Sequence, residues 1–237
     1  MKNLFGLLIS LLLGVFIILA LDSSVSFPKF GEVELSDRVS DEYLDDDNVD
    51  EIGSANIVTA VVVGYRGFDT LGEVTVLFIS ALGVALIFGG SAKQKRLDLK
   101  FKPNFMLRVG SKVLFVIILM TSIYIILHGH LTPGGGFPGG AIIASAMLLM
   151  YLADDKFRSN IRGFKILEGV AGSVFVIIGL LGLVFATYFL QNFLPVGTVG
   201  ALISGGIIPI IYILIGLKVG SEISGIVDNF LTEEEPV

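Results

Sequence analysis

Two carboxylates and one histidine in this sequence occupy positions where an ionisable side chain could carry a proton or a cation. Asp69 and Glu73 stand at the start of a long apolar run, and His130 stands between two later runs. An ionisable group at or inside a membrane-spanning segment is costly, so it is by default a candidate for an ion path. Histidine titrates near neutral pH and can pass protons. These residues are therefore the predicted ion-translocation candidates.

Each candidate also has a structural interpretation. Thr70 and Glu73 have the spacing of a capping box, in which two side chains satisfy each other's backbone N–H groups at a helix start. Asp69 could pair locally with Arg66, and a lone loop histidine is often a surface or packing residue. A capping carboxylate can still titrate, so the two interpretations of Glu73 are compatible. Glu168, near the start of a later run, is interpreted as an interfacial charge.

The segment around His130 reads GHLTPGGGFPGG over residues 129–140. It is not a phosphate-binding loop, because no Gly-Lys-Ser/Thr follows it and no strand precedes it. Irregular backbone at membrane depth is tolerated only where protein or a watery cavity surrounds it. A tight path between helices is therefore predicted. The glycines expected to break or pack helices here are Gly134, Gly135, Gly136, Gly139 and Gly140.

A second helix-breaking group, Gly205, Gly206 and Pro209, is predicted inside the last apolar run. Proline in a helix frees a carbonyl one turn earlier, and such breaks sometimes mark ion sites in transporters. A packed kink is the alternative interpretation.

The elements that must position these residues are long apolar runs. Apolar residues make up 54% of the chain, and their runs are long enough to cross a bilayer. The predicted fold class is an all-α integral membrane protein with about six transmembrane helices. The run at residues 57–63 is too short and is predicted to be interfacial or re-entrant. The six spans are predicted at residues 4–21, 70–89, 113–127, 137–153, 166–190 and 200–219.

Charge divides the chain into segments. Residues 1–21 form a transmembrane anchor, with a cleaved signal peptide as the alternative. An acidic linker at 22–55 follows, and a basic linker at 93–107 separates residues 56–92 from a four-helix domain at 108–225. Residues 226–237 form an acidic tail. Placing both termini in the cytoplasm puts 13 of the 16 Lys and Arg residues inside and the acidic linker outside, as the positive-inside rule favours.

Composition excludes several classes of chemistry. The chain has no cysteine, which removes disulfides, thiolate nucleophiles and cysteine-ligated iron–sulfur clusters. Two histidines are too few for the usual haem or zinc ligand sets. No catalytic residues, metal site or cofactor are therefore predicted in this chain, and it is not expected to be an enzyme by itself.

Two of these segments together resemble a known family. The GHLTPGGGFPGG segment is similar to the GHxxPGGGFxGG signature of the MnhB or MrpB-like subunit of Mrp-type multisubunit Na+/H+ antiporters. Residues 108–225 resemble the four-span layout of that protein. Upstream, NIVTAVVVGYRGFDTLGE at residues 56–73 resembles the carboxy-terminal part of the large MrpA-like subunit of the same antiporters.

The resemblance implies an accessory subunit of a cation/proton antiporter. The MrpA-like segment lacks the large antiporter body of that protein and is joined directly to the MrpB-like segment. That arrangement resembles archaeal membrane-bound hydrogenase and sulfane reductase complexes. Other Mrp-type subunits, and iron–sulfur subunits of the hydrogenase type, are the implied partners. Na+ and H+ are the implied transported ions, and Glu73 and His130 are implied on their path. A structural adaptor, a subunit of a stand-alone Mrp antiporter and a free-standing transporter are the alternatives.

Overall fold

The computed structural model describes residues 2–22, 52–88, 94–96, 102–154 and 157–234. It divides into two units, residues 1–42 and 43–237, each of which is described by itself. The first unit contains helix α1 (Lys2–Asp22), whose side chains between Gly6 and Leu19 are apolar except for Ser10 and mostly exposed. The predicted acidic linker lies outside the described residues, except for its last few positions.

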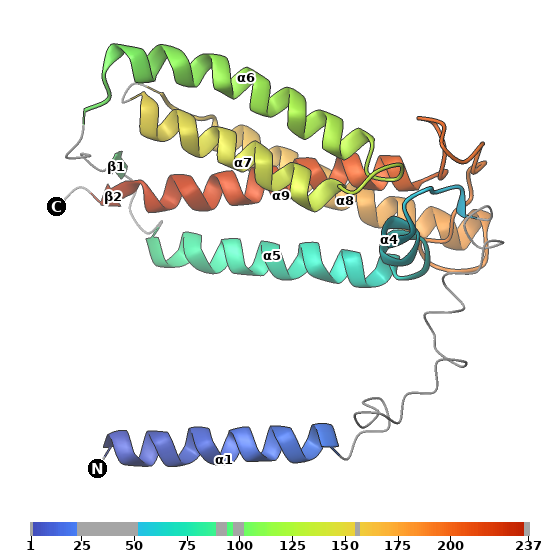
Figure 1. Cartoon of the computed structure of the whole chain (residues 1–237), viewed down its shortest axis with the longest axis horizontal. Helices are drawn as coiled ribbons and strands as arrows, with labels where there is room; N and C mark the ends of the chain where they lie inside the picture. The colour runs from blue at the N-terminus through green and yellow to red at the C-terminus, as the bar shows by residue number, and fades with distance from the viewer. Residues whose placement is uncertain (1, 23–51, 89–93, 97–101, 155–156, 235–237) are drawn as a thin grey trace. The chain divides into compact units, whose positions relative to one another are not determined.

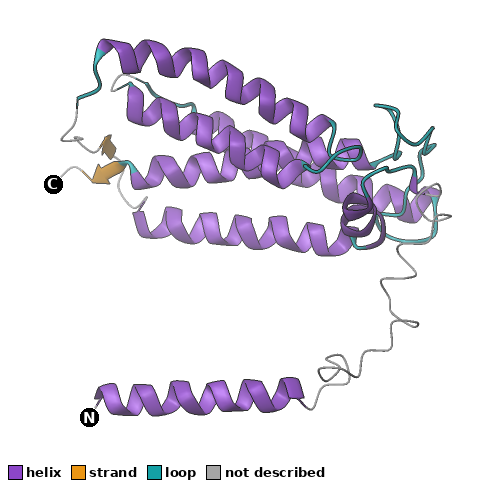
Figure 2. Cartoon of the chain, viewed as in Figure 1, coloured by secondary structure: helices purple, strands orange, loops and turns teal. Residues whose placement is uncertain are grey.

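The second unit is a bundle of helices (Figures 1 and 2). Among its described residues, one turn of α-helix, α4, continues directly into a π-helix, η2. Five long helices follow, and two strands of three residues each complete the unit. Its elements are α4 (Ile57–Thr59), η2 (Ala60–Tyr65), α5 (Gly67–Phe88), β1 (Gln94–Arg96), α6 (Phe105–Leu127), α7 (Gly136–Ala153), α8 (Ile161–Phe185), α9 (Ile208–Phe230) and β2 (Thr232–Glu234).

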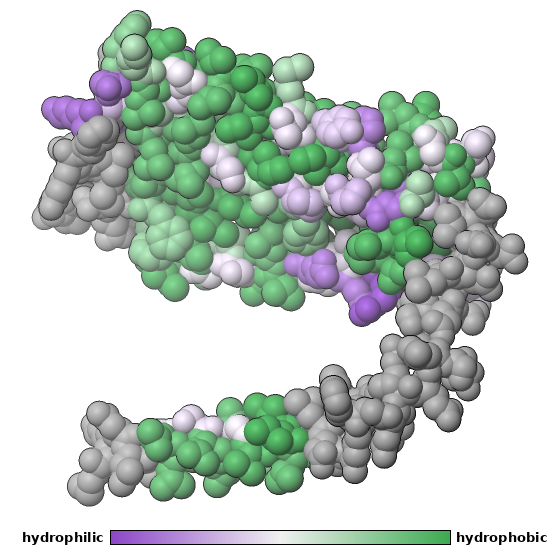
Figure 3. Space-filling view, in the orientation of Figure 1, coloured by the Kyte–Doolittle hydropathy of each residue, from purple (hydrophilic) through white to green (hydrophobic). Residues whose placement is uncertain are grey.

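Length and composition allow five of these helices to cross a membrane, and α1 adds a shorter apolar stretch. Apolar side chains cover most of the visible surface of the bundle, with polar groups toward its ends (Figure 3). A soluble protein would bury such surface, whereas lipid or neighbouring membrane proteins can cover it. The prediction of a multi-pass, helical integral membrane protein is confirmed.

Asparagine side chains begin two of the long helices. Asn104 accepts a hydrogen bond from the Leu107 N–H at 2.8 Å, and Asn160 accepts one from the Gly163 N–H at 3.0 Å. Asparagine is among the preferred residues at this position, because its side chain satisfies an otherwise free backbone donor. These caps start α6 and α8 several residues earlier than the hydropathy of the sequence predicts.

The prediction of a break inside the last span is wrong. Gly205 and Gly206 precede α9, and Pro209 lies in its first turn. Proline is favoured there because its missing N–H would have no partner within the helix, so Pro209 begins the helix and does not kink it. The span therefore runs from Ile208 to Phe230 and includes only the first residues, 226–230, of the predicted acidic tail.

Two further expectations also fail locally. The chain leaves helix α8 at Phe185 and folds back, so that the Leu190 N–H donates to the Gly179 carbonyl at 3.2 Å. The predicted fifth span, ending at 190, is thus too long.

The predicted capping box at Thr70 and Glu73 is wrong as well, because α5 begins at Gly67 and the Thr70 hydroxyl donates to the Val62 carbonyl at 2.8 Å.

Helix α9 packs against α7, α8 and α5, and α7 also packs against α6. Glycines allow the backbones of α7 and α9 to come close together. A methyl group on Gly140 would lie 2.9 Å from both the Gly216 carbonyl and the Gly220 nitrogen. A methyl group on Gly136 would lie 2.6 Å from the Ile215 side chain. The packing role predicted for these glycines matches this geometry.

Strands β1 and β2 pair antiparallel, with Gln94 opposite Glu234 and Arg96 opposite Thr232. They join part of the predicted basic linker to part of the predicted acidic tail. These strands were not predicted from the sequence, because three residues are too few to show an alternating pattern.

Candidate functional site

The carboxylates predicted on α5 are both exposed. Asp69 forms an ion pair of 2.6 Å with Arg66, as the local alternative suggested, and both side chains are more than half exposed. Glu73 lies on the uncovered side of the helix, and no hydrogen bond or ion pair joins it to another described residue. The structure therefore does not bring Glu73 together with His130.

His130 is fully buried in the turn between α6 and α7. Its ring Nε2 lies 3.4 Å from the Ala201 carbonyl, while Nδ1 has no hydrogen-bond partner among the described residues. Burial lowers the pKa of His130, and the hydrogen bond with Ala201 opposes this shift. His130 is thus a packed interior residue and not a surface residue.

Hydrogen bonds connect this turn to the segment before α5. The His130 carbonyl accepts from the Ser54 hydroxyl at 2.9 Å and from the Asn56 N–H at 3.1 Å. The Thr59 hydroxyl donates to the Gly129 carbonyl at 2.7 Å and accepts from the Tyr212 hydroxyl at 2.7 Å. We call Ser54, Asn56, Thr59, His130 and Tyr212 the polar knot. It joins the segment containing α4 to the α6–α7 turn and to α9.

The predicted glycines lie beside this knot and along α7. Gly135 has a φ of 126°, a conformation that favours glycine, and it packs against the Tyr212 ring. Gly134 packs against Ile125, and Gly139 against Ile126. They shape the turn and let α7 approach its neighbours.

A charged pair inside helix α9 was missed in the sequence. Lys218 Nζ lies 2.5 Å from Glu222 Oε1, and the two side chains are only 10% and 0% exposed. The other carboxylate oxygen, Glu222 Oε2, is buried without a hydrogen-bond partner in the described part of the chain. Lys218 Nζ also lies 4.9 Å from the centre of the Phe78 ring, a cation–π arrangement.

This pair could have been recognised from its spacing. Lys218 and Glu222 are four residues apart, so a helix that contains both places them on one face. The predicted span ended at 219, which left Lys218 counted among the cytoplasmic charges and Glu222 outside the membrane. Helix α9 continues about three turns further, to Phe230, so Glu222 joins Lys218 inside the apolar bundle.

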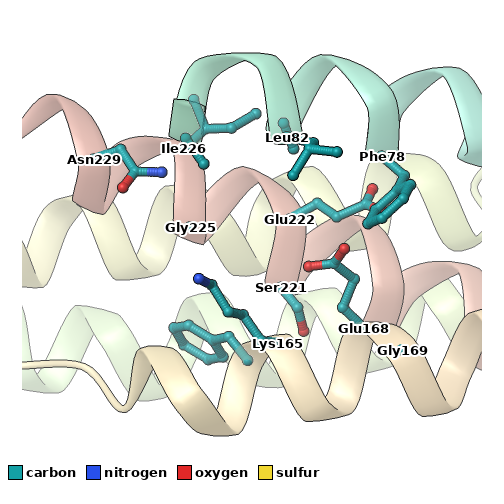
Figure 4. A pocket seen from close by; sticks show the side chains of 13 residues that line it. Phe78, Leu82, Lys165, Glu168, Gly169, Ser221, Glu222, Gly225, Ile226 and Asn229 are labelled. Atoms are coloured by element: carbon teal, nitrogen blue, oxygen red, sulfur yellow. The ribbon is translucent and has the colours of Figure 1, made fainter. Parts of the chain in front are cut away.

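A cavity of about 510 Å³ lies beside the pair, between α5, α8 and α9. Glu222 faces it from α9 and Glu168 from α8, so Glu168 is not merely an interfacial charge (Figure 4). Helix α5 contributes Phe78, Ala81 and Leu82, all apolar. The cavity therefore holds two carboxylates and an adjacent ammonium group within largely apolar walls.

A separate charged group marks the ends of α6 and α7. Asp154 lies 3.6 Å from both the Arg108 and the Lys112 nitrogens. Its carboxylate faces two cations, whereas Lys218 faces two carboxylates from α8 and α9. This contrast makes Asp154 a useful reference for the cavity.

Known proteins resemble both parts of the chain. A family model described as "Domain related to MnhB subunit of Na+/H+ antiporter" matches residues 106–225, and a second, named MbhE and described as a subunit of MBH, matches residues 11–89. An uncharacterized protein of Methanocaldococcus jannaschii is 30% identical over 192 residues, which are 69% of this chain and 72% of that protein. The putative antiporter subunit mnhB2 of Staphylococcus aureus is 34% identical over 93 residues, 38% of this chain and 66% of that one.

Two solved structures are similar over almost the whole chain. One is a chain of the membrane-bound sulfane sulfur reductase, an archaeal respiratory membrane complex, with 46% identity, a TM-score of 0.77 and coverage of 98% of this chain and 99% of that chain. The other belongs to the Mrp complex of a Dietzia species, with a TM-score of 0.71 over 97% of this chain and 26% of that chain; its 24% identity shows the fold alone. The chain belongs to the family related to the MnhB subunit of Na+/H+ antiporters.

Proposed function

We propose that this chain is a non-catalytic membrane subunit of an Mrp-type Na+/H+ antiporter module inside a redox-driven respiratory complex. Its likeness to a chain of the sulfane sulfur reductase, over nearly the full length of both, supports this assignment. Partner subunits carry the iron–sulfur clusters and the redox reaction, while this chain contributes to moving Na+ and H+. Both termini lie in the cytoplasm.

The uncovered face of α5 carries the proposal. Val76 and Ile79 are 67% and 61% exposed there, and Glu73 shares this exposure. Lipid could cover the apolar side chains, but a carboxylate in contact with lipid would be expensive. A neighbouring subunit with a polar or hydrated surface would cover this face and would keep the Glu73 carboxylate out of contact with lipid. Glu73 then lies on an ion path between two subunits, where it binds and releases a proton or a cation.

A structural adaptor is the second candidate. The close approach of α7 to α9 and the polar knot are features that a rigid scaffold requires, and neither needs an ion path. In that case a hydrogen-bond partner on a neighbouring protein would hold Glu73, which would not exchange its proton. Assembly would depend on it and transport would not.

The first test is to purify the tagged full chain from native membranes in a mild detergent and to identify the accompanying proteins. Antiporter subunits together with iron–sulfur proteins are expected. Antiporter subunits alone would indicate a stand-alone Mrp antiporter. Isolation of the chain by itself would contradict membership of a complex.

The second test replaces Glu73 by Gln in the complex and measures Na+-dependent proton flux in proteoliposomes. A loss of at least tenfold is expected, with unchanged subunit composition, because Gln keeps the shape but cannot exchange a proton. Thr75→Val is the matched control, since Thr75 is also exposed on α5 and bonds only within its own helix. Unchanged flux in the Glu73 variant would favour the adaptor.

A further inference from the structure

We propose that the cavity between α5, α8 and α9 is a proton-binding site in which Glu168 and Glu222 share one exchangeable proton beside the Lys218 ammonium. The inference rests on the proposed function, since a stored proton serves a chain that handles ions. It assigns the proton to a place inside this chain, separate from the exposed Glu73.

The charge count is the first argument. With all groups ionised, the buried Glu222 and the half-buried Glu168 face one buried ammonium, Lys218, because the second cation of the lining, Lys165, is exposed to solvent. One excess negative charge is then left in the largely apolar cavity. A buried charge without a partner is strongly unfavourable, and uptake of one proton removes it. The neutral arrangement has Lys218 paired with one carboxylate and the proton on the other.

The geometry supplies a place for that proton. Glu222 uses Oε1 to bind Lys218 at 2.5 Å, while Oε2 is buried and without a partner in the described chain. Glu168 lines the same cavity from the facing helix (Figure 4). A proton can therefore reside on Glu222 Oε2 or on Glu168 without breaking the pair. The cavity of about 510 Å³ has room for water to carry it between them.

The other groups around the cavity favour a proton over a metal cation. Hard cations require several oxygen ligands. Besides the two carboxylates, the lining offers side-chain oxygens only from Asn229 and from Ser221, whose hydroxyl already donates to the Leu217 carbonyl, and the α5 side is apolar. The Lys218 ammonium would also repel a metal ion at Glu222. From α8, Lys165 lies at the cavity edge and is exposed, so water screens its charge. Helix α7, which packs on the other side of α9, contains no charged residue.

The test measures carboxyl protonation directly in the purified native complex. Infrared difference spectra between acidic and alkaline buffers, free of Na+, report the C=O stretch of a protonated carboxyl group. Glu222→Gln and Glu168→Gln should each abolish one protonated-carboxyl band, because the remaining carboxylate then balances Lys218. Lys218→Met should do the opposite and retain the protonated band to higher pH, because two carboxylates lose their counter-charge.

Asp154→Asn is the matched control, because that shielded carboxylate lies outside the cavity and faces two cations. It should leave the band unchanged. Glu168→Gln leaves the Lys218–Glu222 ion pair in place. A band lost in this variant is therefore not explained by misfolding after loss of that pair. A band that persists in both single Gln variants would overturn the proposal. So would a native band that NaCl removes at fixed pH, since the cavity would then be a sodium site. This readout requires no flux, so its failure is distinguishable from failure of the antiporter assignment.

Discussion

Two faces of helix α9 pack in opposite ways. One face presents Gly216 and Gly220 to α7, where the backbones approach closely and no charged side chain intervenes. The other presents Lys218 and Glu222 toward α5 and α8, where the helices leave a cavity. Residues two apart on a helix are separated by about 200° around its axis. Gly216 and Gly220 therefore point away from Lys218 and Glu222, and the same two turns of α9 form both faces.

The comparison separates structural packing from ion chemistry. In lipid, small residues stabilise helix pairs because close approach increases van der Waals contact. A buried ion pair gives little net stability, since desolvation offsets much of its attraction. The glycine face therefore explains how the bundle holds together. The charged face requires another reason to exist, and proton exchange supplies one.

Breaking the buried pair should have the largest effect on stability. Glu222→Leu leaves Lys218 buried and without its carboxylate partner at 2.5 Å, which should lower the free energy of unfolding by about 3–5 kcal/mol. Unfolding of the purified chain in mixed micelles, titrated with a denaturing detergent, measures the change. Lys218→Met combined with Glu222→Leu should recover most of the loss. A double variant as unstable as the single one would show that the pair is needed for packing.

Filling the glycine face should have the next largest effect. A methyl group on Gly140 would meet backbone atoms of α9 at 2.9 Å, so Gly140→Ala should destabilise the bundle by about 1–3 kcal/mol. Gly110→Ala is the control, because nothing lies within 4 Å of that position on α6. Alanine there should be neutral or stabilising. Equal losses in both variants in the same unfolding assay would contradict close packing of α7 on α9.

The polar knot should have a smaller effect. Thr59→Val removes one hydrogen bond to the Gly129 carbonyl and one from Tyr212, at about 1 kcal/mol each. The control is Thr121→Val, because the Thr121 hydroxyl is exposed and bonds only within α6. Hydrogen exchange of the segment containing α4 and η2 measures the local effect. Exchange that is unchanged by Thr59→Val would mean that this segment is held by apolar contacts alone.

The sequence predicts the helices better than the charged site. Apolar runs locate the membrane spans because lipid imposes a minimum length, and the glycine signature indicates close packing around Gly136 and Gly140. Hydropathy alone misplaces helix ends, since it cannot weigh a cap such as Asn104 or a helix-starting Pro209. The error at the end of α9 concealed Lys218 and Glu222. Their partner Glu168 comes from another helix, and no local pattern predicts that meeting.

The smallest expected effect is a pH dependence of stability that comes from the polar knot. Burial holds the pKa of His130 below its ordinary value of 6.5, so the unfolded chain takes up a proton at higher pH than the folded chain does. The free energy of unfolding should therefore be constant above pH 6.5 and should decrease as the pH falls below it. His130→Gln should flatten this decrease, measured by detergent-induced unfolding at several pH values.

His128→Gln is the control, since it leaves the buried ring of His130 in place and the decrease should persist. The knot contains His130 as its one titratable group near neutral pH, whereas the cavity contains a pair of carboxylates beside an ammonium group. If His130→Gln leaves the decrease intact, protonation elsewhere controls acid unfolding. If His130→Gln removes the decrease, the polar knot is the part of the fold that is destabilised when a buried group becomes positively charged. The cavity differs, because its carboxylates are proposed to take up and release a proton in the folded state.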